Sequence, residues 1–203
     1  MYRLYDYLSS GNSYKVRLLL SLLGISYERI DVDIIDGQTR TAAFLARNPN
    51  GRIPTLELED GTHLWESNAI LHYLAEATPF LPAHRLDRAR VLQWMFFEQY
   101  SHEPYIAVLR FWHMHGPMDK QRQAQIEQKR EGGNAALAVM QQHLQSHDWF
   151  VGRRMTIADI ALYAYTHVAG DGGFDLGNYP AIEQWLARVA AQPGYVPITA
   201  GTD

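Results

Sequence analysis

The chain has 203 residues, of which 47% are hydrophobic, and its formal net charge is −4 at pH 7. This hydrophobic fraction is ordinary for a globular protein and is enough for a sizeable core. The negative charge argues against a nucleic-acid partner, which would need a clustered basic surface. The chain contains no cysteine, which excludes disulfides, thiolate metal sites and a cysteine nucleophile.

The first 20 residues contain scattered charges and no apolar run of the kind found in signal peptides. No stretch of the chain is apolar for long enough to span a membrane. The lack of cysteine also fits a reducing compartment. We therefore expect a soluble cytoplasmic protein that has neither a membrane nor a nucleic acid as its partner.

The first part of the chain alternates strand and helix patterns. Residues 2–7 are aromatic, and residues 29–35 alternate apolar with acidic side chains, so both are predicted strands. Between them, apolar residues at helical spacing predict a helix that Ser13 or Asn12 caps and that ends at Gly24. Such a strand–helix–strand unit is expected to be parallel, with a right-handed crossover.

A second helix, a hairpin and a third helix follow. Residues 39–48 predict a short helix, and residues 55–65 predict a hairpin around the turn pair Asp60–Gly61. Ser67 stands where it can cap the next helix. The predicted order is β-α-β-α-β-β-α, in which the hairpin forms an antiparallel edge of the sheet.

Strand patterns nearly vanish after this region, and helical patterns replace them. The proline-containing residues 79–85 are predicted to be a linker. Helices are predicted over residues 86–115, with a break near Pro104, and over residues 120–145, 156–167 and 179–191. We therefore expect an α/β domain over residues 1–78 and an all-helical domain over residues 86–203.

The stretch that leads into the third helix carries residues suited to bind an amino-acid group. Pro54 opens a predicted strand, and proline is tolerated mainly at sheet edges and bulges, so a peptide could pair with the backbone of Ile53. Glu66 can accept an ammonium group, while Ser67 and the amides at a helix start favour a carboxylate. The alternative interpretation is a strand start, a turn and a serine cap, with no ligand.

These residues resemble the pattern of the glutathione S-transferase family, in which Asn-Pro-x-Gly-x-Ile/Val-Pro precedes Glu-Ser at a helix start. Here the pattern runs from Asn48 to Pro54 and continues at Glu66 and Ser67. The resemblance extends over nearly the whole chain. It implies a thioredoxin-like glutathione-binding domain, followed by an all-helical domain that borders the acceptor-substrate site.

The resemblance also implies roles for individual residues. It implies that the Ile53–Pro54 bond is cis and that the Ile53 backbone pairs with the cysteinyl unit of glutathione. Glu66 and Ser67 would hold the γ-glutamyl end. Arg52 and Arg40 are candidates for the glycine carboxylate, because a guanidinium fork suits a carboxylate, although Arg40 equally fits a solvated surface charge.

The loop before the first predicted helix holds the candidates for contact with the sulfur. In the resembled family a hydroxyl or a cysteine stands at the position of Ser10, and some bacterial relatives use an asparagine, here Asn12. A hydroxyl donor and the amides at a helix start would stabilise a thiolate and lower the pKa of the thiol. Ser10 is the favoured residue, with Asn12 as its rival. Tyr5 and Tyr7 are nearby and are weaker candidates.

Three aromatic or apolar residues, Tyr105, Leu109 and Trp112, share one helical face. Such a stripe is usually core, but in the resembled family this helix borders the acceptor-substrate site, so these residues are the acceptor candidates. Thr156 and Asp159 fit a capping box, which we interpret as structural. No histidine pattern predicts a metal site.

The resemblance implies a transferase of detoxification type, in which glutathione is activated as a thiolate that attacks a small apolar electrophile. Glutathione is the co-substrate, no other cofactor is expected, and the expected assembly is a homodimer. A glutathione-dependent disulfide reductase on the same fold is an alternative that Asn12 favours. Isomerisation is a weaker one, because Gly11–Asn12 replaces the Ser-Cys centre of the maleylacetoacetate isomerase motif. A non-catalytic interaction module is the alternative from a different class.

Overall fold

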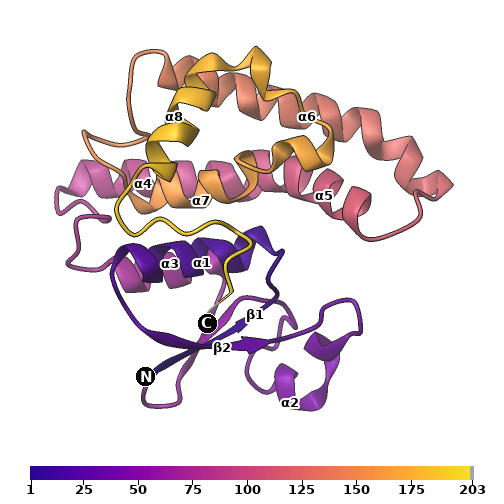
Figure 1. The fold of residues 1–203 in the computed structure, drawn as a ribbon, viewed down its shortest axis with the longest axis vertical. Coiled ribbons are helices and arrows are strands. Elements are labelled where there is room, and N and C mark those ends of the chain that lie inside the picture. The colour runs from indigo at the N-terminus through magenta and orange to yellow at the C-terminus, as the bar shows by residue number, and fades with distance from the viewer. Residues whose placement is uncertain (202–203) are drawn as a thin grey trace. The chain divides into compact units, whose positions relative to one another are not determined.

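The computed structural model describes residues 1–201, which divide into two units (Figure 1). Unit 1 comprises Met1–Glu76 and the C-terminal segment from Gln192, and unit 2 comprises Ala77–Ala191. The sequence had placed the C-terminal segment in the helical domain. It groups with the first unit because polar side chains of the first helix donate hydrogen bonds to its backbone carbonyls.

Unit 1 has the predicted order of strands and helices. Its elements are β1 (Tyr2–Asp6), α1 (Gly11–Leu22), β2 (Tyr27–Asp31), η1 (Gln38–Arg40), α2 (Ala42–Leu45), β3 (Thr55–Glu57), β4 (His63–Trp65) and α3 (Ser67–Ala75). The sheet order is β2-β1-β3-β4, in which β1 and β2 are parallel and the other pairs are antiparallel. This mixed four-stranded sheet confirms the predicted thioredoxin-like fold.

Neighbouring residues of β1 face opposite sides of the sheet, as the pleat requires. Leu4 pairs with Leu56 of β3, and both are fully buried on the face that α1 and α3 cover side by side (Figure 1). Tyr5 points the other way and packs edge-on against Phe44 of α2. The sheet thus packs against apolar side chains on both faces. This packing fixes the positions of the loops at the ends of its strands.

The second strand begins and ends earlier than predicted. The alternation of residues 29–35 had suggested one strand, but β2 covers Tyr27–Asp31. The Asp33 carboxylate accepts the backbone N–H groups of Ile35 at 2.7 Å and Asp36 at 3.0 Å. This local turn satisfies backbone donors that a strand would need, so it competes with strand formation.

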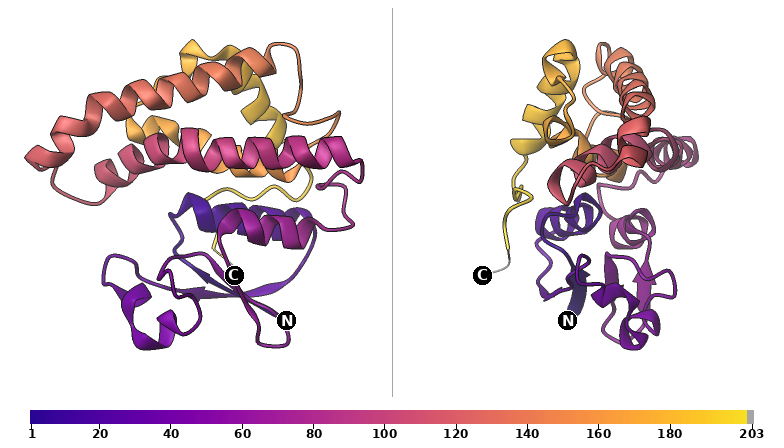
Figure 2. Two further views of the ribbon diagram at one scale, coloured as in Figure 1. Left: turned by 180° about the vertical axis from the view of Figure 1, so that it is seen from behind. Right: turned by 90° about the vertical axis from the view of Figure 1, so that its right-hand side faces the viewer.

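Unit 2 is all-helical, as predicted. Its elements are α4 (Arg85–Phe97), η2 (Glu98–His102), α5 (Glu103–Met114), α6 (Lys120–Leu144), α7 (Ile157–Thr166), η3 (Ala169–Gly172), η4 (Leu176–Asn178) and α8 (Pro180–Ala190). Figure 2 shows α5 and the long α6 side by side. The long pattern over residues 86–115 is interrupted by the π-helical turn η2. Pro104 follows in the first turn of α5, where its missing N–H is tolerated.

The helix α7 forms the centre of unit 2, and all ten of its residues are buried. Trp185 of α8 is fully buried beside it, whereas Leu186, which its helical spacing with Ile182 and Val189 predicts to face inward, is only half-buried. Val139 of α6 is exposed, although its helical spacing with Ala136 and Met140 predicts that it faces inward. The burial of Leu186 and Val139 depends on which neighbouring element each side of the helix contacts. The periodicity of the sequence does not specify those contacts. Among the helices within residues 1–201, none combines the length and apolar character needed to cross a membrane.

Candidate functional site

The loop between α2 and β3 is shaped by one buried side chain, Asn48. Its carboxamide NH2 group donates to the Arg52 carbonyl at 2.7 Å and to the Thr55 hydroxyl at 3.2 Å. Its oxygen accepts the Asn50 N–H at 2.9 Å. Asn48 therefore holds both ends of the loop that carries the proline motif.

The Ile53–Pro54 bond at the end of this loop is cis, which confirms the prediction. The Ile53 side chain packs against the apolar cluster on the α2 face of the sheet. Within residues 1–201, Ile53 makes no backbone hydrogen bond in the structure. Its N–H and C=O groups are therefore available to pair with an extended peptide.

Glu66 and Ser67 occupy the start of α3 in different ways. Glu66 is the N-cap residue, is exposed, and has the left-handed backbone angle φ 67°. Such a conformation costs about 1–3 kcal/mol in a residue other than glycine and is concentrated at functional sites. Ser67 is the first helical residue and is buried, so the prediction that it caps α3 is wrong.

The Ser67 hydroxyl instead reaches across to α1. It donates to the Asn12 side-chain oxygen at 3.2 Å and accepts from the Lys15 ammonium at 3.4 Å. The packing of α1 against α3 thus brings a predicted glutathione-binding residue to a predicted sulfur-contacting residue. Lys15 is fully buried and was not recognised from the sequence. A charged residue in the apolar run of α1 was the available signal.

Ser10 is the N-cap of α1, because its hydroxyl oxygen accepts the Ser13 N–H at 3.3 Å. The prediction that Ser13 or Asn12 caps this helix is therefore wrong. An accepted hydrogen bond leaves the Ser10 O–H proton available for donation. The Tyr5 hydroxyl already has a hydrogen-bond partner, since it donates to the Glu57 carboxylate at 2.7 Å.

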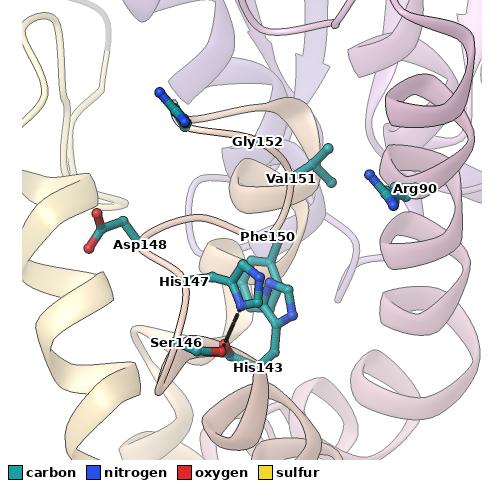
Figure 3. A pocket seen from close by; sticks show the side chains of 9 residues that line it. Arg90, His143, Ser146, His147, Asp148, Phe150, Val151 and Gly152 are labelled. Carbon is teal, nitrogen blue, oxygen red and sulfur yellow. Dashed lines mark hydrogen bonds between the residues drawn. The ribbon is translucent and has the colours of Figure 1, made fainter.

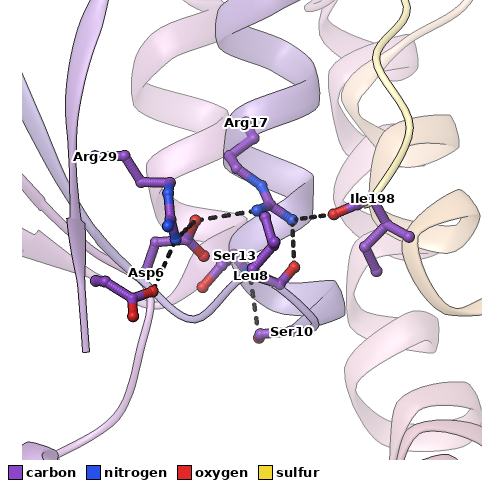
Figure 4. A network of polar contacts seen from close by, with 8 residues as sticks. Asp6, Leu8, Ser10, Ser13, Arg17, Arg29 and Ile198 are labelled. Carbon is purple, nitrogen blue, oxygen red and sulfur yellow. Dashed lines mark hydrogen bonds and ion pairs between the residues drawn. The ribbon is translucent and has the colours of Figure 1, made fainter. Parts of the chain in front are cut away.

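The loop that bears Ser10 is anchored by the buried guanidinium of Arg17 (Figure 4). Arg17 donates to the Asp6 carboxylate at 3.1 Å, to the Leu8 carbonyl at 2.7 Å and to the Ile198 carbonyl at 3.0 Å. Burial lowers the pKa of Arg17, and the charge of Asp6 opposes that shift. Arg17 thus ties β1, the sulfur-side loop and the C-terminal segment together, a role that sequence reasoning missed.

The two arginine candidates are both exposed. Arg40 donates to the Asn50 carbonyl at 3.2 Å and its guanidinium lies over Gly51, where a Cβ atom would collide with it. Asn50 also donates to the Glu66 carboxylate at 3.3 Å. Arg40 and Glu66 are therefore linked through one residue, whereas Arg52 contributes its backbone carbonyl to the loop.

The acceptor candidates lie within unit 2. Leu109 is fully buried, while Tyr105 and Trp112 are half-buried. Tyr105 packs against Gly132 of α6, and the Lys129 ammonium lies 5.8 Å from the Tyr105 ring centre and 5.4 Å from that of Trp112. Tyr105 and Trp112 therefore both lie beside α6. A role for these residues toward an acceptor stays a prediction.

Unit 2 also contains a hollow of about 740 Å³ that holds none of the predicted site residues (Figure 3). The rings of His143 and His147 stack there with their centres 4.3 Å apart, and His143 also stacks on Phe150. Burial lowers the pKa of His143. Among residues 1–201, no group of three His, Cys, Asp or Glu side chains is arranged to hold a metal ion.

Comparison with known proteins agrees with this geometry. The family model described as "Glutathione S-transferase, N-terminal domain" matches residues 1–76, and the one described as "Glutathione S-transferase, C-terminal domain" matches residues 96–193. A solved glutathione S-transferase of Pseudomonas fluorescens is 53% identical and superimposes with a TM-score of 0.96 over 98% of this chain and 99% of that one. Ure2p in complex with glutathione is 25% identical, with a TM-score of 0.84 over 95% of each chain.

Two curated relatives carry names that describe different reactions. The maleylacetoacetate isomerase of Rhizobium meliloti is 34% identical over 93% of this chain and 92% of its own length. The disulfide-bond oxidoreductase YfcG of Escherichia coli is 30% identical over 90% of this chain and 87% of its own length. The matched domains, the fold and these relatives agree that the chain belongs to the glutathione S-transferase family.

Proposed function

We propose that the protein is a glutathione transferase, in which unit 1 binds glutathione and promotes ionisation of its thiol. The observation that carries this proposal is the hydrogen bond between Ser67 and Asn12, 3.2 Å long. It joins the residue that would bind the amino-acid head of glutathione to one that would contact its sulfur. The complex of Ure2p with glutathione supports the choice of ligand.

The backbone and charges around this contact suit a short acidic peptide. Ile53 offers unpaired backbone groups to the cysteinyl unit, in the manner of an added strand. The exposed Glu66 carboxylate can accept the γ-glutamyl ammonium, while the α-carboxylate is favoured at the N-terminus of α3. Arg52 and Arg40 remain the proposed partners of the glycine carboxylate.

The reaction would need only ionisation and proximity. The thiol proton leaves to solvent, the sulfur forms a bond to an electrophilic carbon, and the leaving group departs with its electron pair. Ser10 or Asn12 would stabilise the thiolate by hydrogen bonding. Tyr105, Leu109 and Trp112 remain the proposed contacts for a small apolar acceptor.

Binding measurements on two substitutions test this proposal. Glu66→Gln should weaken glutathione binding by about 1.5–3 kcal/mol, because it removes a hydrogen bond to a charged group, and Ser67→Ala should weaken it because the hydroxyl that joins this end of the site to Asn12 is lost. Isothermal calorimetry measures this, with Glu59→Gln, an exposed acid on the β3–β4 turn, as the matched control. Normal binding by both variants, together with a much lower melting temperature, would mean that the two residues serve α3 alone.

A glutathione-dependent disulfide reductase is the second candidate function. Asn12 contacts Ser67 directly, and the relative YfcG is named for disulfide chemistry. Turnover of a small disulfide, compared with conjugation of an aryl halide, separates the two reactions. Isomerisation belongs in the same panel because of the isomerase relative, and glutathione binding with no turnover in any assay would favour a non-catalytic module.

We also propose that the working form is a homodimer. Leu92, Phe96 and Tyr100 lie about one helical turn apart along α4 and η2, and their side chains are 37%, 69% and 86% exposed. A stripe of large apolar side chains exposed in one copy is suited to meet a second copy of the chain.

A further inference from the structure

Lys15 is buried in the first turns of α1 without any role in the proposal above. Its residue is fully inaccessible to solvent, and its ammonium group donates to the Ser67 hydroxyl at 3.4 Å. Burying an ammonium group is costly unless hydrogen bonds compensate for the lost water. Polar contacts must therefore hold the ammonium group, and the contact with Ser67 leads toward the proposed site.

The chemistry of the three side chains gives their contacts a direction. An ammonium group only donates, so the Ser67 oxygen must accept from Lys15. The Ser67 O–H proton is then directed to the Asn12 oxygen, 3.2 Å away. A carboxamide whose oxygen is held in this way presents its NH2 group on the opposite side, away from Ser67.

We propose that Lys15 is a positioning residue, which holds the Ser67 hydroxyl and, through it, turns the NH2 group of Asn12 toward the sulfur of bound glutathione. This inference rests on the proposed function. The half-buried Asn12 stands in the first turn of α1, beside the Ser10 cap. The chain of hydrogen bonds from Lys15 through Ser67 to Asn12, here called the relay, therefore ends at the loop where the thiolate would form.

The buried positive charge adds to the effect of the oriented amide. Charges interact more strongly in a poorly solvated interior than in water, so Lys15 favours the thiolate over the thiol. Two charged groups near this contact, Arg17 and Glu66, are engaged elsewhere. Arg17 is paired with Asp6, and Glu66, beside Ser67, is exposed and would be occupied by the ligand's ammonium.

The test is the pKa of the glutathione thiol, measured by thiolate absorbance on protein saturated with glutathione. Lys15→Met should raise this pKa by about one unit, which corresponds to a tenfold smaller thiolate fraction well below the pKa. The kcat/KM for conjugation should fall about tenfold there and recover at higher pH, while KM for glutathione changes little. Lys15→Arg should retain much of the wild-type pKa, and Lys120→Met, at the exposed start of α6, is the matched control.

Two further variants separate a relay from a general effect of charge. In an Asn12→Ala background, Lys15→Met should shift the thiol pKa by clearly less than it does in wild type, because the relay is already broken and only the direct effect of the charge remains. Ser67→Ala, which leaves the lysine in place, should raise the pKa at saturating glutathione. Additive shifts, or an unchanged pKa in Ser67→Ala, would overturn the inference even if Lys15→Met does not fold.

The outcomes also distinguish this inference from the proposed function. If wild-type protein binds glutathione as a thiolate and Lys15→Met leaves its pKa unchanged, the inference fails and the function stands. If wild-type protein does not bind glutathione, both are overturned.

Discussion

Ser10 and Asn12 differ at the scale of single residues, although both stand in the loop and first turn before the sulfur site. Ser10 accepts the Ser13 N–H and so completes the N-terminus of α1. Asn12 is joined instead to Ser67 on another helix. The first contact stabilises a local element, whereas the second links two elements at the proposed site.

This difference predicts separable effects of the two alanine substitutions. Ser10→Ala should lower the free energy of unfolding by about 1 kcal/mol, because it removes a helix cap. Asn12→Ala should raise the pKa of the bound thiol more than Ser10→Ala does, with little loss of glutathione affinity. Denaturant unfolding and thiolate absorbance against pH measure the two effects. The reverse order of pKa shifts would restore Ser10 as the main sulfur contact.

At the scale of elements, α7 depends on the buried carboxylate of Asp159. The predicted capping box with Thr156 is confirmed. One carboxylate oxygen accepts from the backbone and hydroxyl of Thr156, at 2.8 and 3.0 Å, and the other from Phe150 N–H at 3.1 Å and Trp185 Nε1 at 3.0 Å. Burial raises the pKa of Asp159 to about 6, although these four hydrogen bonds oppose the shift.

Asp159→Asn should destabilise the protein by about 3 kcal/mol at neutral pH, because an NH2 group then faces hydrogen-bond donors. The loss should depend on pH. The folded-state pKa of about 6 exceeds the unfolded value of 3.8, so the folded protein binds more protons between these values. Lowering the pH through this window therefore stabilises wild type relative to the variant, by at most about 1.4 kcal/mol per pH unit.

Denaturant unfolding of both proteins between about pH 4 and pH 7 measures this difference. Glu183→Gln, on the exposed face of α8, controls for general charge effects. A difference between wild type and Asp159→Asn that stays constant with pH would show that Asp159 remains ionised in the folded protein throughout that range.

At the scale of the whole molecule, the exposed apolar stripe on α4 and η2 predicts the assembly state. Phe96→Glu should weaken dimerisation at least about tenfold, because an interface would bury an unpaired carboxylate. Light scattering and sedimentation at micromolar concentration measure this. Val139→Glu, which changes an exposed apolar residue on α6, is the matched control. A monomeric wild-type protein would contradict the prediction.

The sequence patterns predicted part of the structure of each unit. Alternation of apolar residues, turn pairs and proline positions predicted the element order of unit 1 and the all-helical character of unit 2, because these patterns act within a few residues. The Asn48–Pro54 motif predicted the cis bond and its loop. The strand after α1 was misplaced, since the competing Asp33 turn uses side-chain hydrogen bonds that periodicity does not record.

What the sequence by itself determined is therefore the order of the elements, the family pattern and the positions of Ile53, Glu66 and Ser67 within it. Only the tertiary structure decided that Ser67 meets Asn12 and Lys15, which lie 55 and 52 residues away. It also decided that the C-terminal segment joins unit 1 through Arg17. Those contacts arise from the packing of α1 against α3 and of a distant segment against α1. Local periodicity contains no information about which distant faces meet.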